Sequence, residues 1–144
     1  MPTTTREDAE SLVRRLFEVL EERDRDAFSE LFTDDFEFSP VGLDVEGYAE
    51  AEFSYYEAFP DLTYDLDRIL VDGDHVVFRW RFVGTHAGQG GPEPLASVAP
   101  THAEVDVSGI NIGRIEDGRF AEMWAEWNTL ELCQALGLDP FETD

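Results

Sequence analysis

The stretch from Ile110 to Leu136 constrains the fold more than any other part of the chain. Asp117-Gly118 lies between two runs rich in β-branched and aromatic residues, which is a strong signal for a β-hairpin. Side chains alternate between the two faces of a strand. One face of the second strand therefore carries Phe120, Glu122, Trp124, Glu126 and Asn128. An aromatic ring beside carboxylates and an amide favours a pocket wall, and the alternative is an edge strand with a solvated polar face.

Apolar residues in the first part of the chain recur at helical spacing. They predict a helix that begins after Thr4 or Thr5, a short helix over residues 25–31 and an aromatic-rich helix over residues 45–59. Pro60 should end this third helix, because proline cannot continue the backbone hydrogen bonding.

From Leu62 onward the apolar residues alternate with a period of two, which is typical of strands. The predicted elements are strands over 62–71, 75–85 and 103–115, a loop rich in glycine and proline over 87–100, and a closing helix over 129–137. An irregularity is expected near Asp67-Arg68. Helices followed by an antiparallel meander predict a single α+β domain over residues 1–144, with the helices on one face of a bent sheet.

Ten basic residues, all arginine, stand against 33 acidic ones and give a formal net charge of −23. A field of this sign repels nucleic acid and anionic membranes. The composition is typical of proteins from a high-salt cytoplasm, and an acidic mesophilic protein is the alternative. Cys133 is the only cysteine, which excludes an intrachain disulfide. The polar N-terminus and the lack of a long apolar run favour a cytoplasmic protein.

Four segments follow one another between residues 58 and 128: Ala58–Leu62, Asp72–Gly88, Ser108–Arg119 and Glu122–Asn128. Their composition and spacing resemble those of the SnoaL-like polyketide cyclases (ester cyclases), a family within the nuclear-transport-factor-2-like superfamily. The resemblance implies a cone-like fold in which N-terminal helices pack on a strongly curved antiparallel β-sheet and enclose a deep apolar pocket. It also implies homodimers that form through the outer sheet face, where Val77 and Val83 are expected.

The resemblance further implies an intramolecular aldol condensation of polyketide esters, without cofactor or metal. An aspartate on the last strand acts as acid and base in the family, and this position falls on Asn128. An amide cannot exchange protons near neutral pH, although it can donate a hydrogen bond to a carbonyl or enolate oxygen. Either proton transfer uses another group, or the protein binds its ligand without catalysis.

Two other residues are candidates for this proton transfer. His86 follows an aromatic strand, and histidine is the usual proton carrier at cellular pH. The alternative is a histidine bonded to loop backbone at the mouth of the cone. Glu126 shares a strand face with Trp124 and Asn128, and an apolar pocket would raise the pKa of its carboxyl group. The alternative places Glu126 in solvent at the strand end.

Several aromatic residues are candidates either for the pocket wall or for the core. They are Tyr48, Phe53, Tyr56, Trp80 and Trp124. The three scattered histidines do not form a metal-binding motif. Three functions remain open at this point: an enzyme acting on an apolar carbonyl compound, a non-catalytic binder of a hydrophobic small molecule, and a structural or partner-binding dimer module.

Overall fold

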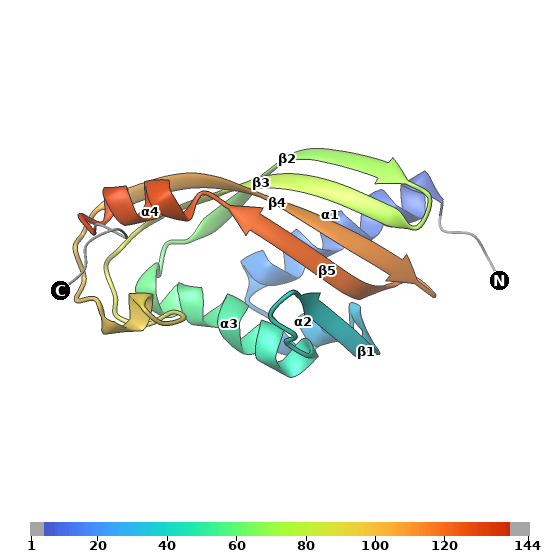
Figure 1. Ribbon diagram of the computed structural model, residues 1–144, viewed down its shortest axis with the longest axis horizontal. Coiled ribbons are helices and arrows are strands. Elements are labelled where there is room, and N and C mark those ends of the chain that lie inside the picture. The colour runs from blue at the N-terminus through green and yellow to red at the C-terminus, as the bar shows by residue number, and fades with distance from the viewer. Residues whose placement is uncertain (1–4, 139–144) are drawn as a thin grey trace.

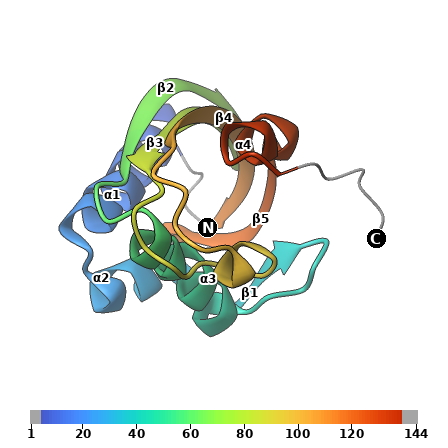
Figure 2. The same ribbon diagram turned by 90° about the vertical axis from the view of Figure 1, so that its left-hand side faces the viewer.

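The computed structural model describes residues 5–138 and shows an α+β fold built on a five-stranded sheet (Figure 1). The strands are β1 (Phe32–Ser39), β2 (Thr63–Asp72), β3 (His75–Thr85), β4 (Glu104–Glu116) and β5 (Arg119–Trp127). Their order across the sheet is β1-β5-β4-β3-β2. The helices are α1 (Arg6–Glu22), α2 (Arg25–Ser29), α3 (Val45–Ala58) and α4 (Thr129–Ala135), with a short 3-10 turn at Leu95–Ser97. Helices α1 and α3 lie on the same side of the sheet (Figure 2).

The expectation of a purely antiparallel sheet is wrong, because β1 runs parallel to β5. Strand β1 has eight residues and forms one edge of the sheet. Two-residue turns set β2 antiparallel to β3 and β4 antiparallel to β5, and β3 pairs antiparallel with β4 across the long segment 86–103. Strand β1 comes from the N-terminal part of the chain, so no tight turn sets its direction against β5.

Local signals explain where the helices begin. The Thr5 hydroxyl accepts a hydrogen bond from the backbone N–H of Asp8 at 3.1 Å, and Asp44 accepts one from Gly47 at 2.8 Å. These caps satisfy backbone donors that a helix start leaves free. The buried face of α1 then packs on the sheet. Among the described residues, no helix is long and apolar enough to cross a membrane.

Strand β2 contains the irregularity expected near Asp67-Arg68, because the pairing with β3 shifts between Leu66 and Arg68. The inward face of β3 is apolar and aromatic. Val76, Phe78 and Phe82 are buried, and they pack beneath the helices.

A second bulge, in β5, reverses the expected faces of that strand. Ile115 pairs with Phe120 while the next pair joins Arg114 to Glu122, so Ala121 is an extra residue. A bulge of one residue moves all following side chains to the opposite face. The inward residues after it are Met123, Ala125 and Trp127. Glu122, Trp124 and Glu126 consequently point to the outer face.

Candidate functional site

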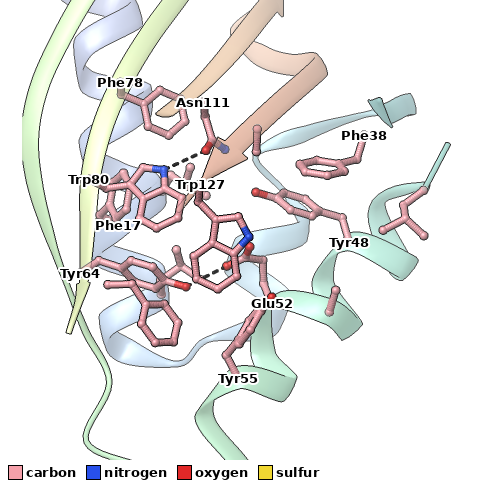
Figure 3. A pocket seen from close by; sticks show the side chains of 16 residues that line it. Phe17, Phe38, Tyr48, Glu52, Tyr55, Tyr64, Phe78, Trp80, Asn111 and Trp127 are labelled. Carbon is pink, nitrogen blue, oxygen red and sulfur yellow. Dashed lines mark hydrogen bonds between the residues drawn. The ribbon is translucent and has the colours of Figure 1, made fainter. Parts of the chain in front are cut away.

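A cavity of about 200 Å³ lies between α1, α3 and the inner face of the sheet (Figure 3). Its wall is mainly apolar and aromatic, and Glu52 is the only charged side chain among its described lining residues. An apolar cavity of roughly 150 Å³ is large enough to bind benzene. This cavity can therefore hold a compound of about one or two rings.

Glu52 reaches the cavity from the middle of α3. The Tyr64 hydroxyl on β2 donates a hydrogen bond to Glu52 Oε2 at 3.2 Å (Figure 3). Burial raises the pKa of the Glu52 carboxyl group to about 7, and the bond from Tyr64 partly opposes this rise. A carboxyl group with this pKa exchanges protons near neutral pH.

Helical spacing brings Glu52 into the aromatic wall. Tyr48, Glu52 and Tyr55 are separated by four and three residues, so they share the face of α3 that points to the sheet. The sequence interpretation missed Glu52 because it considered only the aromatic residues of this helix as candidates for the pocket wall or the core. A single carboxylate within an aromatic stripe was the signal that could have identified it.

A group of polar atoms lies on the strands that line the cavity. Trp80 Nε1 donates to Asn111 Oδ1 at 2.8 Å, and Asn111 is buried. Asn111 Nδ2 lies 3.1 Å from Met123 Sδ, and the Tyr48 hydroxyl lies 3.5 Å from the same sulfur. A thioether is a weak acceptor. Both donors can therefore turn to a stronger acceptor, such as a carbonyl oxygen of a ligand.

The phenols of this site remain protonated. Burial raises the pKa of Tyr48 and of Tyr64 well above the usual value, and the nearby Glu52 charge raises both further. Burial also raises the pKa of Tyr55. Each hydroxyl can thus donate a hydrogen bond throughout the physiological pH range.

Two of the five predicted aromatic residues, Tyr48 and Trp80, line the cavity. Phe53 lies on another face of α3 and packs edge-on against Phe28, with ring centroids 5.3 Å apart. The Tyr56 hydroxyl donates to the carbonyl oxygen of Leu20 at 2.7 Å. Phe53 and Tyr56 are therefore part of the core that holds α3 in place.

Trp124, Glu126 and Asn128 do not line the cavity. The bulge at Ala121 turns Trp124 and Glu126 to the outer face, where Glu126 is exposed. Asn128 is also exposed and lies beyond the strand end, where its Oδ1 accepts a hydrogen bond from the N–H of Glu131 at 3.1 Å and caps α4. The expectation that this strand face forms the pocket wall is wrong, and Ala125 and Trp127 of the opposite face line the cavity.

His86 is fully buried outside the cavity wall. Its Nδ1 accepts a hydrogen bond from the backbone N–H of Thr101 at 3.1 Å, and its ring lies 5.4 Å from that of Phe59. Burial lowers the pKa of His86, and the nearby His102 lowers it further. The structure thus places His86 against the backbone of the 87–103 loop, which was the alternative to a pocket role.

Within residues 5–138, no group of three histidine, cysteine, aspartate or glutamate side chains could hold a metal ion. The cavity offers one carboxyl group, hydrogen-bond donors on Tyr48 and Asn111, and an aromatic wall.

The sequence matches the model of the SnoaL-like polyketide cyclase family over residues 10–136. Among solved structures, TsrD from Streptomyces laurentii is 26% identical, with 92% of this chain and 97% of that chain covered and a TM-score of 0.81. A candidate SnoaL-like polyketide cyclase from Jannaschia sp. CCS1 is also 26% identical, with coverage of 92% and 94% and a TM-score of 0.77. IdmH from Streptomyces antibioticus, a candidate polyketide cyclase, shares the fold at 24% identity, with coverage of 90% and 98% and a TM-score of 0.74. No curated protein matches the sequence.

Proposed function

Because this chain belongs to the SnoaL-like polyketide cyclase family, we propose that it transfers protons on an apolar carbonyl compound, with Glu52 as the base. The observation that carries the proposal is a carboxyl group in an apolar cavity with a pKa raised to about 7. A general base is most effective when its pKa lies near the working pH. Glu52 on α3 takes the role that the amide of Asn128 cannot perform.

In the proposed aldol reaction, the Glu52 carboxylate removes a proton from the carbon next to a carbonyl group, and the electron pair of the C–H bond forms an enolate. The enolate carbon then bonds to a second carbonyl carbon of the same molecule, whose oxygen becomes an alkoxide. The protonated Glu52 returns its proton to that alkoxide. The product of this step is an isomer of the substrate, and the carboxylate is restored.

Tyr48 and Asn111 are the proposed donors to the enolate oxygen. Both face the cavity, and both have the Met123 sulfur as acceptor. Exchange of a thioether for a developing oxyanion strengthens their hydrogen bonds as the charge forms, which lowers the barrier. The Trp80 indole occupies Asn111 Oδ1, so the amide presents Nδ2 as its donor.

The cone-like enclosure by a strongly curved sheet belongs to the same proposal. Helices α1 and α3 and strands β2–β5 all contribute to the wall. Such an enclosure limits the access of water to the carboxylate, and low polarity strengthens electrostatic interactions inside.

We also propose that the chain forms a homodimer through its outer sheet face. Cross-strand pairing places Leu70, Val77, Ile112 and Trp124 in one row across four strands. Leu70 is 59% exposed and Ile112 is 39% exposed. An apolar row of this length on an exposed sheet face favours burial against a second copy.

Deuterium exchange of 2-tetralone tests the proposed base without knowledge of the natural substrate. This two-ring ketone forms an enolate when it loses a proton next to its carbonyl group, and proton NMR in heavy water follows the loss. We expect the wild type to exchange the probe on the order of 100-fold faster than Glu52→Gln, a typical contribution of a general base. Glu46→Gln is the matched control, since Glu46 lies on α3 but is exposed. Equal rates for wild type and Glu52→Gln would contradict the proposal.

A further inference from the structure

Aromatic rings from α3, β2, β3 and β5 lie around the Glu52 carboxyl group (Figure 3). The rings of Tyr64 and Trp80 meet with centroids 5.7 Å apart, and those of Trp80 and Trp127 are 6.0 Å apart. Tyr55 approaches Trp127 at 5.7 Å. These four rings, here called the aromatic cage, line the same cavity as Glu52.

The only charge among the described residues of the cavity wall is the negative charge of Glu52. Glu52 belongs to none of the ion pairs found among residues 5–138, and no arginine or histidine is among the described residues of the cavity wall. Its hydrogen-bond donor, Tyr64, is neutral. A carboxylate held in an apolar cavity without a cation is costly, and a cation beside it lowers that cost.

We propose that the aromatic cage binds a small organic cation, a protonated or quaternary amine, with Glu52 as its counter-ion. The faces of tryptophan and tyrosine rings attract cations, and desolvation strengthens this attraction. The cavity of about 200 Å³ limits the cation to about one or two rings. The net charge of −23 raises the local concentration of cations. This binding does not depend on the proton transfer proposed above.

The affinity for the cation should rise with pH, because only the ionised Glu52 attracts it. The pKa of Glu52 is raised to about 7, so the carboxylate becomes the main form above that pH. The other titratable side chains in the cavity wall are the phenols of Tyr48, Tyr55 and Tyr64, and these stay neutral. Helix α1 faces the cavity with Leu16, Phe17 and Leu20, and strands β3–β5 face it with side chains that do not titrate.

Choline and 3,3-dimethylbutan-1-ol form a matched pair of probes, since the second has the same shape with carbon in place of the charged nitrogen. Titration calorimetry in 0.5 M KCl suppresses attraction to the general surface charge. At pH 8.5 we expect the wild type to bind choline at least about tenfold more tightly than the alcohol. At pH 6 this preference should fall several-fold.

Substitutions distinguish choline binding in the aromatic cage from choline binding to the charged surface. Glu52→Gln should reduce the preference for choline to within about threefold and remove its pH dependence, whereas the exposed Glu46→Gln should leave both unchanged. Trp127→Leu, which keeps the carboxylate, should weaken choline binding about tenfold relative to wild type. Equal affinity for the two probes, or an equal loss in both glutamine variants, would overturn the proposal. Because these readouts involve binding alone, they stand apart from the exchange of 2-tetralone.

Discussion

The Tyr64 hydroxyl donates a hydrogen bond to Glu52 Oε2 at 3.2 Å, which joins strand β2 to helix α3 at the cavity. This bond stabilises the ionised carboxylate and so opposes the rise that burial causes in the pKa of Glu52. In the proposed reaction, Tyr64 is therefore a positioning residue that keeps Glu52 ionised near neutral pH.

Tyr64→Phe should raise the pKa of Glu52 above its value of about 7. A hydrogen bond to a charged group contributes roughly 1.5–3 kcal/mol, which corresponds to about one pKa unit or more. The rate of 2-tetralone exchange, followed as a function of pH, should then reach its plateau at higher pH. Tyr55→Phe removes a hydroxyl from the same wall without loss of this bond, so an equal shift in both variants would count against the assigned role.

Asn111 and Asn128 should respond differently to replacement by alanine. Asn111→Ala removes a donor from the cavity, and we expect exchange of 2-tetralone to slow about 100-fold, as for loss of one oxyanion donor. Asn128→Ala removes the cap of α4 and should cost about 1 kcal/mol of stability with little change in rate. Chemical denaturation and the exchange assay measure the two effects. If only Asn128→Ala showed a large loss in the rate of 2-tetralone exchange, the active site would lie at the end of β5 instead.

The sequence was sufficient to predict the elements whose signals are local. The Asp117-Gly118 hairpin and the helix that ends before Pro60 depend on neighbouring residues, and the structure agrees with both predictions. The extra residue Ala121 has no such local signal, because a bulge is set by pairing with β4. Since that bulge decides which face of β5 lines the cavity, the site expected from simple alternation was wrong.

The parallel pairing of β1 and the position of Glu52 show the same limit. Phe32 pairs with Phe120, far away in the chain, so local pattern could not give the direction of β1. The helical spacing of Tyr48, Glu52 and Tyr55 is visible in the sequence, but which face of α3 meets the cavity depends on packing against Phe28 and the sheet. Tertiary contacts therefore determined the part of the site that the sequence interpretation missed.

Ile112→Glu should dissociate the proposed homodimer. The substitution places a charge in the middle of the apolar row on the outer sheet face, where burial of an unpaired carboxylate is costly. Light scattering in molar KCl should report a dimer for the wild type and a monomer for the variant. Val41→Glu changes another exposed apolar residue away from this row and should stay dimeric. A wild-type monomer would contradict the proposed interface.

The stability of the fold should depend on salt, because 33 acidic residues oppose only ten basic ones. Repulsion among like charges destabilises the compact state, and salt screens it. We expect the melting temperature to rise by several degrees or more between 0.05 and about 2 M KCl, as for a protein of a high-salt cytoplasm. A melting temperature that stays constant over this range would contradict the prediction that the protein comes from a high-salt cytoplasm.

The most direct test of the central claim is the titration of the Glu52 carboxyl carbon by carbon-13 NMR, with assignment by its loss in Glu52→Gln. The folded protein should show a midpoint near pH 7, since burial in the aromatic wall disfavours the charged form. The pKa of Glu52 is higher in the folded protein than in the unfolded chain. The contribution of Glu52 to the free energy of unfolding is therefore full below about pH 4.5 and is lost as the pH rises through 7. A midpoint near 4.3, the ordinary value for glutamate, would show that Glu52 is a solvated carboxylate and not the base of this site.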